Sequence, residues 1–287
     1  MSHVAKRPTL TVLIPARTGM NLGPTLCGVL DQGVPGVELL VVDLSDAQAV
    51  AAEVGRHRRE GVRRLACPQA TPGAGLNQAL RVARGAWVGV LAEGEVYEPG
   101  ALVQVMERLG EGVEWLVGEC EGWDEEGLAV SLPRTREPAD FGDFLAEQGG
   151  HLPMASGFVD RELLERLGGF DEGLELAWDH ELVCRLLSTG ASPRVCRLAW
   201  TVLPVGDRRG GCPVTRETER TWVARRYARH LPESRRRALE AQCDRREAVL
   251  ARAQTESRSD SERRRVWARV LSGGVWLGED VGWRRAA

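Results

Sequence analysis

The residues best suited to chemistry are carboxylates that follow strongly apolar runs. Asp43 ends the run Val37–Asp43 (VELLVVD), and Glu93 and Glu95 follow the run Ala86–Leu91 (AWVGVL). Carboxylate oxygens accept hydrogen bonds from ligands and coordinate divalent cations. Asp43 could instead cap the helix that follows, but its place at a strand end favours ligand binding. Glu93 and Glu95 could hold a cation, although a solvated loop is the simpler interpretation.

A second polar group opens a helical segment. Asp179, His180 and Glu181 stand at the start of the pattern Asp179–Leu187, in which apolar residues recur with helical spacing. Asp179 suits the N-cap of this helix, because its short side chain accepts backbone hydrogen bonds, and it could also act on a substrate. His180 could titrate near neutral pH, but a histidine on a helix surface is usually solvated.

The first 120 residues alternate strand-like and helix-like segments. The apolar, strand-like segments are Thr9–Pro15, Val37–Asp43, Val62–Cys67, Ala86–Leu91 and Trp115–Glu119. The helix-like segments between them are Asn21–Gln32, Ala47–Arg59, Ala74–Arg84 and Pro99–Leu109. This alternation predicts an α/β fold with a mostly parallel, Rossmann-like sheet flanked by helices. In such a sheet, ligands bind beyond the carboxyl ends of the strands.

The pattern changes after residue 120. The segment Glu121–Asp140 is polar and is expected to be irregular. Two later segments, Met154–Val159 and Arg194–Leu203, have the composition of strands. An arginine-rich helical pattern begins at Thr215 and is followed by Gln254–Glu262, whose low apolar content predicts a hinge or disordered link.

Charge is distributed unevenly along the chain. The formal net charge is −3, yet residues 208–287 hold 20 arginines and only 11 acidic residues, so residues 1–207 are strongly acidic. We therefore predict a domain over residues 1–207 and an arginine-rich helical C-terminal extension over residues 208–287. The extension could contact a protein or an anionic membrane surface, but solvated helix faces explain its charge better. Few aromatic residues are interleaved with the arginines, which argues against a nucleic-acid partner.

Composition argues against several classes of protein. No apolar run reaches the roughly 18–20 residues that a membrane-spanning helix needs. The start, residues 1–8, lacks the apolar stretch of a secretory signal, so we expect a cytoplasmic protein. The seven cysteines are odd in number and never spaced as Cys-x-x-Cys, which argues against a disulfide framework and a zinc site.

Four segments resemble, in order, motifs of the family 2 glycosyltransferases, which have the GT-A fold. Thr11–Arg17 (TVLIPAR) is similar to the opening strand of that family, and Val37–Asp46 (VELLVVDLSD) to its second strand. Gly75–Ala83 (GLNQALRVA) resembles the helix that precedes the metal-binding strand. Gly168–Leu182, with its GGFDE and WDHEL pieces, resembles the acceptor-side signature. The resemblance therefore implies a GT-A fold over most of the predicted first domain.

The resemblance also implies roles for individual residues. The nucleotide would be bound by Pro15, Ala16, Arg17, Asp43, Ser45 and Asn77. The acceptor side would hold Trp178, His180 and Glu181. Asp179 would be the general base that removes the proton of an acceptor hydroxyl, as one carboxylate must in an inverting transfer.

The chain departs from the family at Leu91–Pro99 (LAEGEVYEP). The family has Leu-Asp-x-Asp-Asp there, and these aspartates hold a divalent cation, Mn²⁺ or Mg²⁺, that neutralises the leaving diphosphate. Ala92 and Gly94 stand at the two Asp-x-Asp positions, so we expect poor affinity for the cation. The remaining candidates for its ligands are Glu93, Glu95 and Asp207.

These features favour an inverting glycosyltransferase that moves a sugar from a nucleoside-diphosphate sugar to a hydroxyl acceptor, such as a glycan or a natural product. Arg17, a fixed cation, could replace part of the missing metal charge. The alternative is a catalytically reduced relative that binds a nucleotide, a glycan or a partner protein as a scaffold. Retention of Asp43 and Asp179 favours the enzyme, whereas the loss of aspartates at positions 92 and 94 favours the scaffold.

Overall fold

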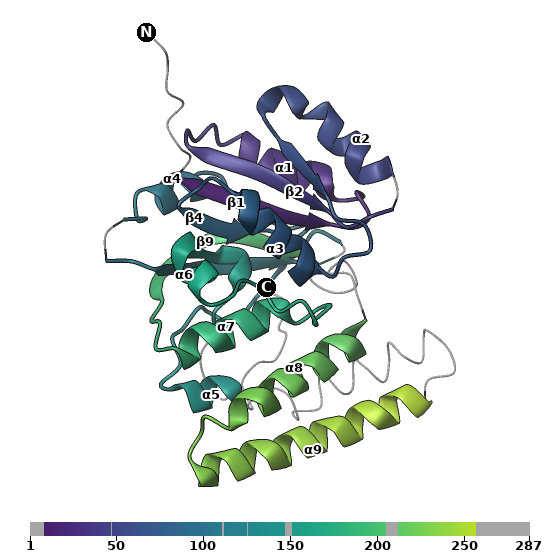
Figure 1. Cartoon of the computed structure of the whole chain (residues 1–287), viewed down its shortest axis with the longest axis vertical. Helices are drawn as coiled ribbons and strands as arrows, with labels where there is room; N and C mark the ends of the chain where they lie inside the picture. The colour runs from purple at the N-terminus through teal and green to yellow at the C-terminus, as the bar shows by residue number, and fades with distance from the viewer. Residues whose placement is uncertain are drawn as a thin grey trace.

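The centre of the protein is a single twisted sheet (Figure 1). The computed structural model describes residues 9–46, 48–110, 112–124, 126–146, 151–204 and 212–256. Within these ranges the strand order is β3-β2-β1-β4-β8-β6-β9-β5, and β7 pairs with β6.

The first four strands form a parallel half-sheet. They are β1 (Leu10–Ala16), β2 (Val37–Asp43), β3 (Arg63–Ala66) and β4 (Trp87–Val90). β1 lies between β2 and β4 and is parallel to both, and β3 is parallel to β2. β1 and β2 are buried almost throughout, as expected for apolar strands covered on both faces. The connecting helices are α1 (Leu22–Leu30), α2 (Gln48–Arg56) and α3 (Pro72–Val82).

The second half of the sheet mixes strand directions. Its strands are β5 (Val96–Tyr97), β6 (Trp115–Trp123), β7 (Ala129–Val130), β8 (Gly157–Asp160) and β9 (Arg194–Pro204). β8 is antiparallel to both of its neighbours, β4 and β6. β6 and β9 are parallel, and β5 closes the edge antiparallel to β9. The predicted α/β fold with a mostly parallel sheet is therefore confirmed, with β8 as a reversed strand inside it.

Two of the predicted segments differ from the structure. Met154–Val159 is a strand only from Gly157, because Met154–Ser156 forms a 3₁₀ turn. Glu121–Asp140 is not wholly irregular: its first three residues extend β6, which pairs with β7 through Gly122↔Val130 and Trp123↔Ala129. Pairing with neighbouring strands overrides the polar composition of this segment.

A hydrophobic core covers each face of the sheet. Because side chains alternate along a strand, Val12 and Ile14 of β1 point to one core and Leu13 to the other. The first core contains α1, α2 and α4 (Ala101–Met106). The second contains side chains of α3, α5 (Phe141–Leu145), α6 (Arg161–Arg166) and α7 (Trp178–Ser188).

The arginine-rich region forms a helical hairpin on the far side of α7 (Figure 1). Its helices are α8 (Pro213–Ala228) and α9 (Glu233–Glu256). Val223 and Tyr227 of α8, and Leu239 and Cys243 of α9, belong to the same core as α7. The described part of the extension therefore shares the core of the preceding domain. Gln254–Glu256 lies within α9, so the predicted hinge is wrong there, and its remainder lies outside the described residues.

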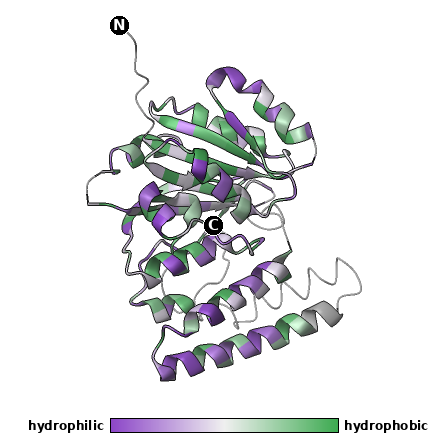
Figure 2. Ribbon diagram, in the orientation of Figure 1, coloured by the Kyte–Doolittle hydropathy of each residue, from purple (hydrophilic) through white to green (hydrophobic). Residues whose placement is uncertain are grey.

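Hydrophilic residues make up much of both helices (Figure 2). Several of their arginines pair with acids inside the molecule: Arg225 with Asp244 and Glu247, and Arg235 with Asp140. These pairs reduce the charge that the hairpin can offer to an anionic partner. No helix in the described ranges is long and apolar enough to cross a membrane.

Candidate active site

The carboxyl ends of three neighbouring strands define the candidate site. Ala16, at the end of β1, is in register with Asp43 at the end of β2. Leu13 of β1 is in register with Val90, the last residue of β4. The segment after β1 consequently lies between Asp43 and the loop that follows β4, as the parallel arrangement predicts.

Asp43 is buried at the end of β2 with both carboxylate oxygens engaged. Its Oδ1 accepts hydrogen bonds from the backbone N–H (3.0 Å) and the hydroxyl (2.6 Å) of Ser45. Its Oδ2 lies 3.2 Å from Nε of Arg64 on β3. Asp43 therefore accepts the hydrogen bonds that close the turn after β2. Each carboxylate oxygen has two lone pairs, so acceptor capacity remains for a ligand at this edge.

Glu93 anchors the loop between β1 and α1. Its carboxylate accepts hydrogen bonds from the backbone N–H groups of Arg17 (3.0 Å), Thr18 (3.1 Å) and Asn21 (3.3 Å), and from the Thr18 hydroxyl (2.7 Å). Burial by itself raises the pKa of Glu93, but the hydrogen bonds from Thr18, Arg17 and Asn21 outweigh it and lower the net pKa. A residue predicted to decorate a loop or to bind a cation is thus an internal anion that shapes the β1–α1 loop.

Because Glu93 holds this loop as a carboxylate, we expect Glu93→Gln to be less stable than the wild type at neutral pH. The difference in stability should shrink as the pH falls. The folded-state pKa is lowered, so the stabilisation is present at neutral pH and is lost as the pH falls through the folded-state pKa. At neutral pH the variant should be less stable by roughly 1–3 kcal/mol. Urea unfolding of both proteins across an acidic pH series measures this. A stability difference that stays constant or grows on acidification would contradict the assignment.

The loop at positions 92–95 offers few atoms to a divalent cation. Ala92 and Gly94 have no side-chain oxygen that could coordinate a cation, and both carboxylate oxygens of Glu93 hold the β1–α1 loop. Oε2 of Glu95 accepts a hydrogen bond from the Ala92 N–H at 2.8 Å. No group of three histidine, cysteine or acidic side chains converges as a metal site in the described ranges. These residues do not fit the expected cation. Asp207 lies outside the described residues.

Asn77, on α3, holds the Gly-Gly-Phe-Asp turn in place. Its Oδ1 accepts from the N–H of Phe170 at 2.8 Å. Its Nδ2 donates to the Phe170 carbonyl at 2.9 Å and to the Glu172 carboxylate at 2.8 Å. Both ends of this buried amide are therefore used inside the protein. The residue predicted to bind the nucleotide thus connects α3 with the turn that contains Phe170 and Glu172.

Arg17 reaches across the edge of the sheet. It directly follows the buried residues Pro15 and Ala16, whose side chains face the interior. Its guanidinium lies 3.6 Å from the carboxylate of Glu175, and each side chain is about half exposed (52% and 53%). This pair connects the end of β1 with the segment that leads into α7. It brings the predicted nucleotide side and the predicted acceptor side together at one edge.

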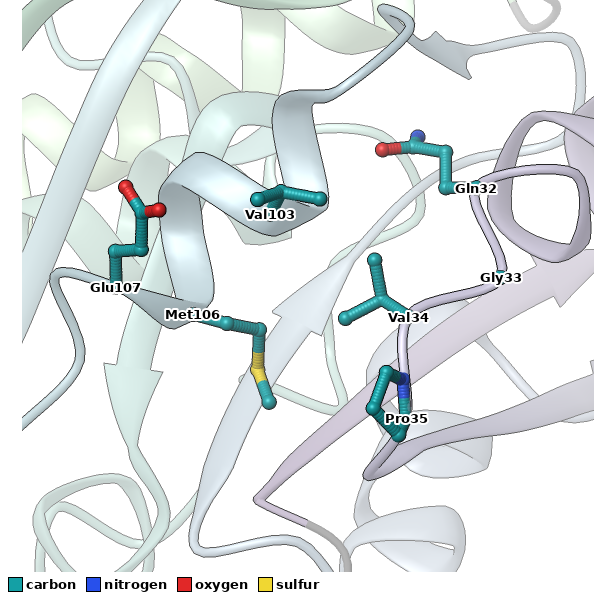
Figure 3. Close-up of a pocket in the computed structure, with 7 residues that line it drawn as sticks. All are labelled: Gln32, Gly33, Val34, Pro35, Val103, Met106 and Glu107. Carbon is teal, nitrogen blue, oxygen red and sulfur yellow. The ribbon is translucent and has the colours of Figure 1, made fainter.

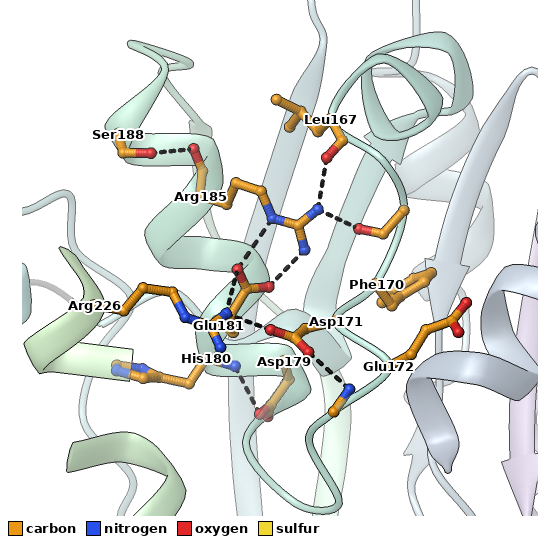
Figure 4. A network of polar contacts seen from close by, with 12 residues as sticks. Leu167, Phe170, Asp171, Glu172, Asp179, His180, Glu181, Arg185, Ser188 and Arg226 are labelled. Carbon is orange, nitrogen blue, oxygen red and sulfur yellow. Dashed lines mark hydrogen bonds and ion pairs between the residues drawn. The ribbon is translucent and has the colours of Figure 1, made fainter. Parts of the chain in front are cut away.

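The start of α7 carries the predicted general base. Asp179 lies in the first turn, and its Oδ1 accepts from the N–H of His180 at 2.7 Å (Figure 4). The N-cap of the helix is Ala177, so Asp179 does not fill that position. Trp178 packs edge-on against Phe170, with ring centroids 5.8 Å apart. Asp179 is partly buried, and the residue before it, Trp178, is held by its packing on Phe170.

Two residues predicted for the acceptor side are packed into the protein. His180 is not a solvated surface residue: its ring stacks on Phe144 of α5, with centroids 5.5 Å apart. Glu181 is buried and accepts hydrogen bonds from Arg185 (2.5 and 3.1 Å) and from the hydroxyl of Tyr227 on α8 (2.7 Å). Figure 4 shows the pair of Glu181 and Arg185 beside Asp179. The position of Glu181 suits a structural role in holding α7.

A further buried carboxylate, which the sequence did not single out, meets the same segment. Glu219 of α8 accepts hydrogen bonds from the backbone N–H groups of Glu175, Leu176 and Ala177, each at 2.8 Å. These three residues precede α7 directly. Glu219 stands in an arginine-rich helical pattern without a recognisable motif, so its role depends on how α8 packs against α7.

An apolar hollow lies away from this edge. It is lined by Val34, Pro35, Val103 and Met106, between the loop after α1 and helix α4 (Figure 3). This loop leads into the first residue of β2, whereas Asp43 is the last residue of that strand. The hollow is therefore at the amino ends of the strands, opposite the candidate site.

The chain matches no protein-family model and no curated protein. It is similar to solved structures of S. aureus TarS. With TarS 1–349 in complex with UDP-GlcNAc the TM-score is 0.64 at 16% identity, covering 92% of this chain and 80% of that chain. With the crystal structure of TarS it is 0.62 at 17% identity, covering 92% and 48%, so this chain spans about half of the TarS length.

A second similar structure comes from another organism. The mannosyltransferase PcManGT from Pyrobaculum calidifontis, in complex with GDP-Man and Mn²⁺, gives a TM-score of 0.55 at 18% identity, covering 94% of this chain and 81% of that chain. Likeness at these identities establishes a common fold. The chain has the mixed α/β, GT-A-like fold of these glycosyltransferases.

Proposed function

We propose that the protein is an inverting glycosyltransferase that uses a nucleoside-diphosphate sugar. The observation that carries this proposal is the meeting of Arg17 and Asp43 with the segment that leads to Asp179, joined by the Arg17–Glu175 pair. The donor would lie along the carboxyl ends of β1 and β2, with the acceptor beside the start of α7. Similar structures with bound UDP-GlcNAc and GDP-Man support a donor of this class.

In the proposed reaction, Asp179 removes the proton of the acceptor hydroxyl as its oxygen attacks the anomeric carbon of the sugar. The bond from that carbon to the diphosphate breaks, and its electron pair leaves with the diphosphate. A single displacement of this kind inverts the configuration of the sugar. Trp178, the residue before Asp179, would offer an aromatic surface to the acceptor, and its packing on Phe170 fixes the position of its ring.

The leaving diphosphate needs positive charge, and Arg17 is the proposed source. Its guanidinium is half exposed and can leave Glu175 for a phosphate oxygen. Arginine matches phosphate geometry through two parallel N–H donors. Because the donor set at positions 92–95 does not fit a divalent cation, no step is assigned to Mn²⁺ or Mg²⁺.

A specific observation favours the second candidate, a scaffold that binds a nucleotide, a glycan or a partner protein without turnover. Glu93 stands inside the altered acidic motif and anchors the β1–α1 loop. The motif has therefore acquired a structural use that needs no catalysis. The scaffold and the enzyme share the donor site and differ in whether Asp179 supports transfer.

Calorimetric titration with a panel of nucleoside diphosphates, including UDP and GDP, tests the donor site. We expect one of them to bind, with an affinity that changes little on addition of Mn²⁺. Arg17→Met should weaken this binding about tenfold, the effect of losing one charge-assisted contact. Glu175→Gln, which removes only the competing partner, should not weaken it. Binding that requires Mn²⁺ and is insensitive to Arg17→Met would contradict the proposal.

A further inference from the structure

Helix α8 supports the segment before Asp179 through one buried carboxylate. Oε1 of Glu219 accepts from the N–H of Glu175, and Oε2 accepts from Leu176 and Ala177, all at 2.8 Å. Glu219 is only 4% exposed, so its hydrogen bonds are shielded from water. A charged, water-excluded acceptor with three donors is a strong and well-directed contact.

The segment requires such an acceptor. Backbone N–H groups at the start of a helix have no partner within the helix, and the N-cap residue Ala177 has no side-chain acceptor to offer. Glu219, on another helix, accepts from the N–H of Ala177 and from those of Glu175 and Leu176, which precede the helix. Its negative charge is also favourable at the positive end of the α7 dipole.

Both ends of the supported segment reach the candidate site. The side chain of Glu175 pairs with Arg17 at the end of β1, while its backbone N–H is held by Glu219. Asp179 follows Ala177 by two residues, within the first turn of α7. The position of the Asp179 carboxylate therefore depends on a backbone that α8 holds in place.

Further contacts from α8 hold the two flanks of this segment. Arg226 pairs with Asp171 of the Gly-Gly-Phe-Asp turn (Figure 4), and the Tyr227 hydroxyl donates to Glu181 on α7 at 2.7 Å. Glu219 is the member of this set that holds the backbone directly before α7. We propose that Glu219 is a positioning residue for Asp179, and that α8 is a working part of the site. This assignment rests on the proposed transferase function.

Glu219→Gln tests the assignment with little change in volume. The amide has one acceptor oxygen, and its NH₂ group faces backbone N–H donors, so part of the contact is lost. Hydrogen exchange at the amides of residues 175–177 should become faster. A small misplacement of a catalytic group costs up to about 10²-fold in rate, so transfer should fall roughly 10–100-fold. Nucleotide affinity and donor KM should stay unchanged, because the proposed donor residues Arg17 and Asp43 lie at the ends of β1 and β2, outside the segment that Glu219 holds.

Glu217→Gln is the matched control. Glu217 is an acid on the same helix, with 12% of its side chain exposed, and it lies 3.9 Å from Arg220 of that helix. This variant should leave transfer and the exchange of residues 175–177 unchanged. Melting curves of both variants show whether each is folded at the assay temperature.

The possible results separate the positioning role from the proposed function. Faster exchange and lower kcat with unchanged donor KM in Glu219→Gln support the positioning role. Full activity in that variant, or an equal loss in Glu217→Gln, overturns it while the transferase stands. A wild-type protein that neither transfers nor hydrolyses any nucleotide sugar overturns the proposed function, and the role of Glu219 with it. In that last case the exchange data still report whether the contact forms.

Discussion

Replacing Asp179 with asparagine is expected to lower sugar transfer by roughly 10²–10⁴-fold, the usual contribution of a positioned general base. Asparagine cannot take the acceptor proton, although it keeps the size of aspartate. It also keeps the oxygen that accepts the His180 N–H at 2.7 Å. The stability change should stay below about 1 kcal/mol, because only a charge in the first helical turn is lost. Nucleotide affinity should remain at the wild-type value.

Single-turnover transfer, or slow hydrolysis of the donor where the acceptor is not known, measures this effect. A melting curve and a nucleotide titration of each protein accompany the assay. In the scaffold alternative, there is no transfer to lose and nucleotide binding is the same in both proteins. Wild-type activity that persists undiminished in Asp179→Asn would remove this carboxylate from the mechanism.

Gly169→Ala is expected to destabilise the protein by roughly 2–5 kcal/mol, which combines two separate effects. Gly169 has a φ of +76°, a conformation that costs other residues about 1–2 kcal/mol. A methyl group there would also lie 2.2 Å from Oδ1 of Asn77. Relief of this contact must disturb the buried hydrogen bonds between Asn77 and Phe170, worth about 1–3 kcal/mol. Urea unfolding at neutral pH provides the measurement.

Two comparisons separate these effects. Gly168→Ala is the matched control, because Gly168 also has a positive φ (+88°) but no atom within 4 Å of the added methyl group. It should show only the backbone cost of about 1–2 kcal/mol. In an Asn77→Ala background the clashing atom is gone, so Gly169→Ala should then cost about as much as Gly168→Ala. Equal costs for the two glycines in the wild-type background would show that Asn77 does not hold the turn.

The parallel half of the sheet could be predicted from the sequence because its strands are buried on both faces. β2 spans the predicted Val37–Asp43, and β1 is displaced by only one residue from Thr9–Pro15. A continuous run of valine, isoleucine and leucine is typical of a parallel strand that is buried on both faces. A strand was predicted at Met154–Val159, but the reversed direction of β8 and the 3₁₀ turn before it could not be predicted, because strand direction depends on which partner a short segment finds. The same holds for β6 beyond Glu119, which continues because it pairs with β7 and β9.

The candidate site was predictable in location and less so in detail. Position at a strand end was enough to place Asp43 at the carboxyl edge of the sheet, where ligands of such folds bind. The hydrogen-bond partner of Asn77 could not be predicted from the sequence, because Phe170 lies 93 residues further along the chain. The hydrogen bonds of Glu93 could not be predicted, because they depend on the conformation of the β1–α1 loop. Glu219 was missed for a related reason: only the packing of α8 on α7 brings its carboxylate to three backbone donors.

A crystal structure of the protein with a bound nucleoside diphosphate tests the central claim most directly. Our account predicts density for the nucleotide at the carboxyl ends of β1 and β2, beside Asp43. The guanidinium of Arg17 should have left Glu175 for a phosphate oxygen. A nucleotide seated elsewhere, for example in the hollow beside Met106, would contradict the account, as would a diphosphate held by a cation at positions 92–95.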